Sequence, residues 1–164
     1  MECANSSGEP LRETSHLSSL AAALADLVGT FSFATAHSTS LDVGAQTTKA
    51  IGAHGKWKAR LLDAIESGSH SEDVAKVALD NVCVFGQWLH SADVSPAYAQ
   101  FRDQARAEHA QFHKEAAAVL TLIGAGKITE ARFAIDMDGS FAAISRELPA
   151  TMTAWRKRTQ AALV

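Results

Sequence analysis

The sequence has few cysteines, no long apolar run and no surplus of charge of one sign, and each absence excludes a class of protein. Two cysteines, Cys3 and Cys83, are too few for a disulfide framework. The most apolar stretch, residues 17–33, is interrupted by serines and Asp26, so we expect no segment that spans a membrane. Lys and Arg number 15 against 18 Asp and Glu, with both signs interspersed, which argues against a nucleic-acid-binding surface.

The N-terminus also lacks the pattern of a secretory signal peptide. Acidic side chains stand where a signal peptide has a positively charged region followed by an apolar core. Hydrophobic residues form 47% and charged residues 20% of the chain, which is typical of a folded domain and not of a disordered segment. These features predict a cytoplasmic globular protein with one domain and with no nucleic-acid or membrane partner.

Almost every local pattern is helical. Alanine is abundant, and no apolar–polar alternation lasts long enough to predict a strand. Apolar spacing and boundary residues predict helices over 17–31, 41–65, 71–91, 95–123 and 127–161. The last helix is expected to break near Asp138-Gly139 or to kink at Pro149. The predicted fold is all-α, an antiparallel up-and-down bundle of four core helices plus an extra N-terminal helix.

This interpretation divides the chain into three parts. Residues 1–12 are polar and are expected to form a disordered tail, residues 13–38 an N-terminal helical extension, and residues 39–162 the helical bundle. The apolar face of the extension must be covered by something, which favours a homodimer or a partner interface.

Histidines and one cysteine carry the strongest chemical signal. His109 and His113 are four residues apart in a predicted helix, so both imidazoles project from one face and can approach one ion. Cys83 falls inside the predicted 71–91 helix, and His54 falls in the helix before it. Three imidazole nitrogens and a thiolate suit tetrahedral zinc, and a closed set of four leaves no position for a reacting water. This favours a structural or sensing site over a catalytic one.

Each of these residues also has an ordinary structural explanation. A histidine pair on a helix is common without a metal, and a free cysteine is often a small buried hydrophobe. His90 lies seven residues after Cys83 and is interpreted as a cation at a helix C-terminus, with ligation as the lesser alternative. Three histidines with a water in place of Cys83 would be competent for metal catalysis, but no acidic residue has an evident general-base position, and Glu108 is expected to point elsewhere. The remaining histidines are expected at the surface: His16, His37 and His70.

The four ligand candidates stand in three sequence blocks together with aromatic residues. The blocks read His54-Gly-Lys-Trp57, Cys83-Val-Phe85-Gly86-Gln-Trp88 and His109-Ala-Gln-Phe112-His113. In their order and separations they resemble the pattern of the chemoreceptor zinc-binding domain family. The resemblance covers about residues 42 to 160. It implies Zn²⁺ as the metal, His54, Cys83, His109 and His113 as its ligands, and an all-α bundle that is often a homodimer.

The resemblance also implies a regulatory function without catalysis. Domains of this family are attached to, or act on, bacterial signalling proteins, chiefly chemoreceptors and diguanylate cyclases, and some are implicated in sensing hypochlorous acid through the cysteine. Zinc sensing, oxidant sensing at Cys83 and a purely structural zinc site therefore stay open. The chain contains no Gly-Gly-(Asp/Glu)-Phe motif and no receptor hairpin, so we expect an output partner in trans or a longer protein.

The other residues of the three blocks are interpreted structurally. Trp57, Phe85, Trp88 and Phe112 are expected in the core, where they would exclude water from the ligands. Gly86 in the middle of a predicted helix costs up to about 1 kcal/mol relative to alanine, so we expect a neighbouring helix to approach closely there.

Overall fold

The computed structural model describes residues 42–162, which belong to one compact unit, Thr39–Val164. The predicted tail and N-terminal helix, with Cys3, His16 and His37, lie outside the described residues. The described chain forms helices over residues 42–67, α2 (Val74–Val77), α3 (Val84–Ser91), the 3₁₀ helix η1 (Pro96–Tyr98), α4 (Ala99–Gly124), α5 (Ile128–Ile135) and α6 (Ser140–Ala161). No strand occurs between residues 42 and 162, so the all-α prediction is confirmed, whereas the up-and-down order stays a prediction.

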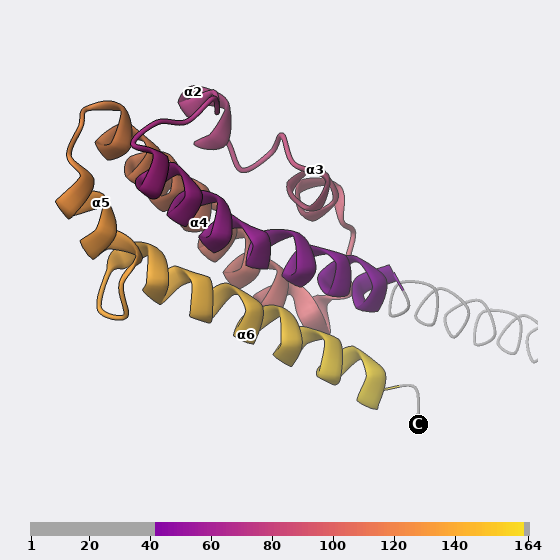
Figure 1. Cartoon of the computed structure of the whole chain (residues 1–164). Coiled ribbons are helices and arrows are strands. Elements are labelled where there is room, and N and C mark those ends of the chain that lie inside the picture. The colour runs from indigo at the N-terminus through magenta and orange to yellow at the C-terminus, as the bar shows by residue number, and fades with distance from the viewer. Residues whose placement is uncertain (1–41, 163–164) are drawn as a thin grey trace, which may run out of the picture. The chain divides into compact units, whose positions relative to one another are not determined.

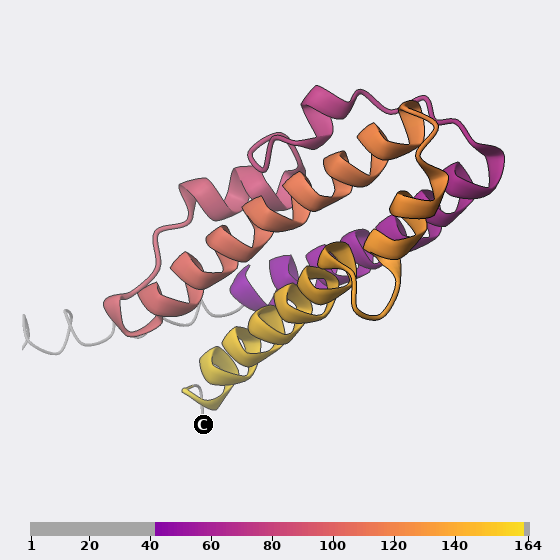
Figure 2. The same cartoon turned by 90° about the vertical axis from the view of Figure 1, so that its left-hand side faces the viewer.

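The helix α4 is the central element of the domain. It contacts α2, α3, η1, α5 and α6. Figures 1 and 2 show the 42–67 helix, α4 and α6 as three long helices lying side by side, with the short α2 and α3 along α4. None of the described helices is both long and apolar enough to cross a membrane.

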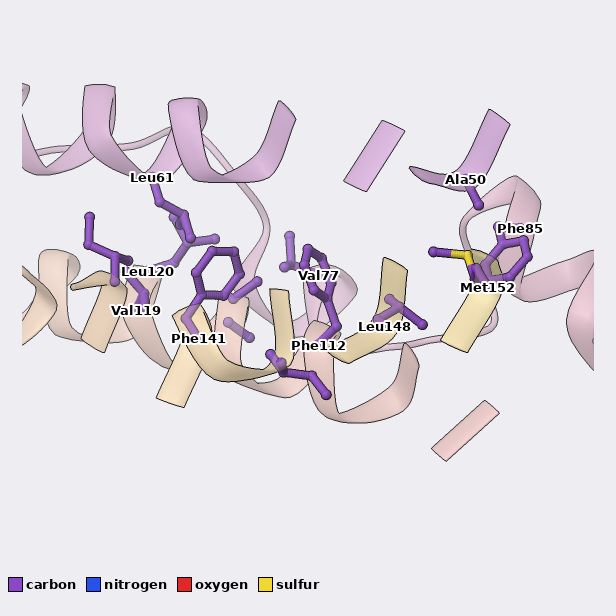
Figure 3. Close-up of a cluster of buried hydrophobic side chains, with 14 of the residues drawn as sticks. Ala50, Leu61, Val77, Phe85, Phe112, Val119, Leu120, Phe141, Leu148 and Met152 are labelled. Atoms are coloured by element: carbon purple, nitrogen blue, oxygen red, sulfur yellow. The ribbon is translucent and has the colours of Figure 1, made fainter. Parts of the chain in front are cut away.

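Buried positions on the three long helices recur every three or four residues and face a common core. On the 42–67 helix this stripe contains Val43, Thr47, Ala50, His54, Leu61 and Ile65, and on α4 it contains Ala105, His109, Phe112, His113, Ala116, Leu120 and Ile123. On α6 it contains Phe141, Ile144, Leu148, Met152 and Trp155. Figure 3 shows part of this core, from Leu61 and Leu120 at one end of the view to Phe85 and Met152 at the other. The stripes of the 42–67 helix and of α4 therefore carry histidines among apolar residues, whereas the stripe of α6 is apolar throughout.

The predicted 71–91 helix is wrong, because the chain leaves helical conformation between Ala78 and Cys83. The helix α2 has only four residues, and its N-cap is Asp73, whose side chain accepts from the Lys76 N–H, and not Ser71. Asp80 and Asn81 occupy the break, and both residue types favour turns because their side chains compete for local backbone groups.

The other predicted boundaries agree more closely with the structure. The 42–67 helix is followed by Gly68 with φ of 67°, and α4 is followed by Gly126 with φ of 72°, a conformation that glycine adopts without a Cβ penalty. The break near Asp138-Gly139 separates α5 from α6, whereas Pro149 lies inside α6. Pro96 begins η1, which leads directly into α4.

Candidate metal centre

His54 lies on the buried stripe of the 42–67 helix and is 6% exposed. Its Nδ1 lies 2.7 Å from the carbonyl oxygen of Ala50, one turn earlier in the same helix. Because a carbonyl can only accept, Nδ1 carries the proton and Nε2 keeps a free lone pair. That lone pair points toward α4, where Nε2 of His109 lies 3.1 Å away.

Cys83 is the N-cap of α3 and not an interior residue of a helix as predicted. Its side chain is half-buried, and its Sγ accepts from the backbone N–H of Gly86 at 3.2 Å. A position at a helix N-terminus favours a negatively charged sulfur, but burial dominates here and raises the pKa of the Cys83 thiol. Without a cation nearby the sulfur therefore holds its proton at neutral pH.

His109 and His113 lie one helical turn apart on α4 and are 0% and 4% exposed. Nδ1 of His113 donates to the carbonyl oxygen of Val77 at 2.7 Å, which fixes its proton on Nδ1 and leaves Nε2 free. Nδ1 of His109 is buried and has no hydrogen-bond partner among the described residues.

The four predicted residues are brought together. Nε2 of His109 lies 3.2 Å from Nε2 of His113 and 3.4 Å from Sγ of Cys83, and one ligand atom of each of the four residues lies within 4.8 Å of every other. A tetrahedral zinc with nitrogen at about 2.0–2.1 Å and sulfur at about 2.3 Å places its ligand atoms about 3.3–3.6 Å apart. The cluster is thus close to the size that such an ion requires.

The protonation of the histidines also fits a cation. Burial lowers the pKa of His54 and His113, and burial together with the neighbouring His113 and His54 lowers the pKa of His109 to about 3. All three rings are therefore neutral near pH 7. Because His54 and His113 keep their protons on Nδ1, their two Nε2 lone pairs face a common point, and one Nε2–H from His109 can satisfy only one of them at a time. A bound cation would accept one nitrogen lone pair from each of the three imidazoles.

Aromatic rings enclose the histidines. Phe85 lies edge to face with His109 at 5.2 Å between ring centroids, and Phe112 with His54 at 5.0 Å. Both phenylalanines are buried as predicted, whereas Trp57 and Trp88 are only partly buried against the core. Trp88 donates its indole N–H to Asp42 at 2.6 Å, a contact between residues 46 positions apart that no local sequence pattern indicates.

Gly86 meets the 78–83 backbone segment in addition to the neighbouring helix that we expected, which is α4. A Cβ on Gly86 would overlap the carbonyl oxygen of Asp80 and would lie 3.0 Å from Cε1 of His109. The glycine is therefore required because the 78–83 connection folds back over the start of α3.

Two further histidines, His70 and His90, lie outside the cluster. His70 is half-buried, not at the surface as predicted, because the turn at Gly68 brings it onto α4, where its Nε2 lies 3.0 Å from the Leu120 carbonyl oxygen. His90 is not a member of the cluster and pairs with Asp80 at 2.7 Å.

Glu108 and Glu115, the acidic residues next to the histidine pair in the sequence, do not face the cluster. Glu108 accepts from Gln104 and from Thr151 of α6, and Glu115 accepts from Gln111 and from Ser140 of α6. Neither carboxylate belongs to the group of ligand atoms. Both side chains therefore serve packing between α4 and α6.

An open groove of about 570 Å³ leads from the surface to the cluster. Its walls include His54, Cys83 and His113, the apolar side chain of Val84, and the charged side chains of Lys49 and Lys76. Val84 is 77% exposed at the mouth of this groove. One side of the ligand cluster, including the sulfur, is thus accessible to small molecules.

The fold and the site define a helical domain with a buried cluster of nitrogen and sulfur ligands. The model of the chemoreceptor zinc-binding domain family matches residues 54–120, a stretch that contains all four ligand candidates. Residues 54–120 are therefore similar to this zinc-binding family, and the resemblance predicted from the three blocks is confirmed over them. Neither the curated proteins nor the solved structures give a match to the chain.

Proposed function

We propose that this chain is a cytoplasmic regulatory domain that binds one zinc ion through His54, Cys83, His109 and His113 and has no catalysis of its own. The observation that carries the proposal is the convergence of three neutral imidazoles and a thiol, with two imidazoles held by backbone carbonyls so that Nε2 faces the common point. This hydrogen bonding of the second nitrogen is typical of metal-ligating histidines.

The ligands come from three chain segments whose packing would depend on the ion. His54 belongs to the 42–67 helix, Cys83 to the start of α3, and the histidine pair to α4. When bound, zinc supplies a cross-link among these segments, and its binding energy becomes conformational free energy. The carbonyl of Val77, which orients His113, ties α2 to the same set. A change in packing follows only if one arrangement holds the ion better than the other.

The output that we propose is a change in a signalling partner, a chemoreceptor or a diguanylate cyclase, and the domain acts as a homodimer. The description of the family as a chemoreceptor domain supports this assignment. Exposed aliphatic side chains flank the cysteine, Leu79 at 50%, Val82 at 37% and Val84 at 77% exposure. They give the site a surface through which a partner could detect movement of the 78–83 segment.

A second function uses the same site for oxidant sensing. The groove exposes the half-buried sulfur of Cys83, and zinc holds such a cysteine as a thiolate, the form that oxidants attack. Oxidation of the sulfur by hypochlorous acid would weaken one ligand and release the start of α3. A purely structural zinc site is the third alternative.

The experiment measures metal content and chelator competition on protein purified without added zinc. We expect one zinc per chain, and we expect Cys83→Ser and His113→Ala each to weaken binding by more than the about 10- to 100-fold that loss of an outer hydrogen-bond partner costs. His70→Ala is the matched control, because it removes a half-buried histidine outside the cluster and should leave the affinity unchanged.

The same titration separates the alternatives. Reversible filling and emptying with a change in helix packing or dimerisation supports zinc sensing. Zinc that resists chelators and leaves only when dilute hypochlorous acid modifies Cys83 supports oxidant sensing. Zinc that neither reagent exchanges supports a structural site, and absence of zinc after reconstitution would overturn the ligand assignment.

A further inference from the structure

Beside the ligand cluster, a second group of polar side chains has no part in the proposed coordination. It consists of Asp80 in the 78–83 connection, His90 in the last turn of α3 and Arg106 on α4. Asp80 Oδ2 lies 2.7 Å from Nε2 of His90, and a guanidinium nitrogen of Arg106 lies 2.9 Å from Nδ1 of the same ring. Because a guanidinium only donates, Nδ1 of His90 accepts, and its Nε2–H donates to Asp80. The carboxylate is therefore held in place by two helices.

Asp80 lies beside two of the ligands, Cys83 and His109. It precedes Cys83 by three residues, and its carbonyl oxygen shares with Cε1 of His109 the space beside Gly86. Asp80 thus brings a negative charge next to the cluster, where it favours a bound cation.

A zinc ion in this cluster would leave one uncompensated positive charge. Three neutral imidazoles and one thiolate reduce the ion's charge of two to a net charge of one, in a site whose histidines are at most 6% exposed. Buried charge is costly unless an opposite charge stands nearby. The carboxylate of Asp80 is negatively charged and lies next to the cluster, so it can supply this opposite charge. Only 25% of its side chain is exposed.

We propose that Asp80 is the counter-charge of the zinc site, oriented by His90 and Arg106, and that its negative charge sets a large part of the affinity for the ion. This inference rests on the proposed zinc binding. Asp80 contacts no metal in this proposal; it is a positioning and electrostatic residue that acts on the ligands from outside.

The test compares Asp80→Asn with the control Asp93→Asn. The amide oxygen of asparagine can still accept from His90, so the substitution removes the charge and keeps the hydrogen bond. Asp93 is an exposed aspartate in the loop after α3 and loses the same charge farther from the ligands in sequence. We expect Asp80→Asn to raise the zinc dissociation constant about 10- to 100-fold, and Asp93→Asn to change it less than about twofold.

Two further readouts separate charge from structure. The melting temperature of the metal-free protein should be similar in Asp80→Asn and wild type, while the zinc-induced rise in melting temperature is reduced. Cobalt substitution should give the same ligand-field spectrum in both, because the four ligands are unchanged. Asp80→Glu, which restores the charge, should recover most of the affinity.

An Asp80→Asn protein that binds zinc as tightly as wild type would overturn the inference while leaving the zinc site intact. If Asp80→Asn does not fold, His90→Leu removes the ring that orients Asp80 and leaves Asp80 itself unchanged; it should bind zinc more weakly than wild type, and binding as tight as wild type would contradict the counter-charge. A wild-type chain that binds no zinc would remove both the proposed function and this inference.

Discussion

Two backbone carbonyls decide which nitrogen of each histidine can reach an ion. The carbonyls of Ala50 and Val77 take the Nδ1 protons of His54 and His113, and Nε2 of each ring is then a pure acceptor. His109 has no such acceptor, because its buried Nδ1 has no hydrogen-bond partner among the described residues. The backbone therefore fixes the proton position of His54 and His113 but not that of His109, whose pKa burial and the neighbouring histidines lower to about 3.

We expect the metal-free domain to lose stability as the pH falls below about 6.5. Unfolded histidines titrate near 6.5, whereas burial lowers the pKa of His109 to about 3, so the unfolded chain binds the proton first. Stability is greatest above 6.5 and is lost as the pH falls toward 3. His109 alone should cost about 2 kcal/mol at pH 5, and the lowered pKa values of His54 and His113 act in the same direction. Urea unfolding of the metal-free protein at pH 7 and pH 5 measures the difference.

A His109→Phe variant serves as the control for this pH dependence. It fills the same buried site with an aromatic ring that cannot take up a proton, so the loss between pH 7 and pH 5 should shrink by about the contribution of one histidine. Equal losses in the variant and the wild type would show that other groups carry the effect.

Sequence spacing predicted which histidines come together but not the backbone hydrogen bonds that orient their rings. The histidine pair and the position of His54 on an apolar stripe place three imidazoles on faces that pack together. The carbonyls of Ala50 and Val77 carry no sequence signal, since every residue has one. Asp80 has a signal only in hindsight, because an Asp-Asn pair three residues before Cys83 indicates a turn.

At the scale of helices, periodicity located the long elements and missed the break between α2 and α3. Long helices bury a stripe whose spacing shows in the sequence, as on α4. The 78–83 connection instead exposes Leu79 and Val82, so its apolar residues imitate a helical pattern without belonging to a buried face. This is why Cys83 was predicted inside a helix although it caps one.

We expect Gly86→Ala to be destabilising and to weaken zinc binding. The new methyl group would overlap the Asp80 carbonyl oxygen, a backbone atom that cannot move without shifting the connection that carries Cys83. Overpacking of this kind typically costs about 1–3 kcal/mol. Thermal unfolding of the metal-free protein and a zinc titration on the same preparation measure the two effects.

The matched substitution is Gly52→Ala on the 42–67 helix. A Cβ at Gly52 meets nothing within 4 Å, so alanine should stabilise the helix by about 0.4–1 kcal/mol and leave zinc binding unchanged. If both substitutions lowered stability equally, the close approach at Gly86 would not be the cause.

At the scale of the whole molecule, the ligands occupy only part of the chain. The family match ends at residue 120, whereas α6 contributes Met152 and Trp155, both fully buried, to the core beside α4. Trp155 lies 5.6 Å, ring centroid to ring centroid, from Trp88 of α3. The last helix therefore supports the cysteine-bearing helix without supplying a ligand.

We expect deletion of residues 1–38 to change the oligomeric state and to spare zinc binding. All four ligand candidates lie between residues 54 and 113, within the unit that begins at Thr39. The predicted apolar face of the N-terminal segment, in contrast, is the surface that we expect to be covered in a dimer. Light scattering after gel filtration gives the mass, and chelator competition gives the affinity, for the full chain and the deletion variant side by side. Loss of zinc binding in the deletion variant would contradict the expectation.

The three imidazoles and the thiolate also determine which of the cell's metal ions the domain can bind. No carboxylate of the described residues belongs to the cluster, and magnesium and calcium require oxygen ligands. These abundant ions should leave the domain unaffected at any ordinary concentration. Imidazole and thiolate, however, bind copper more strongly than zinc. Zinc can therefore occupy this site in the cell only where free copper is kept scarce.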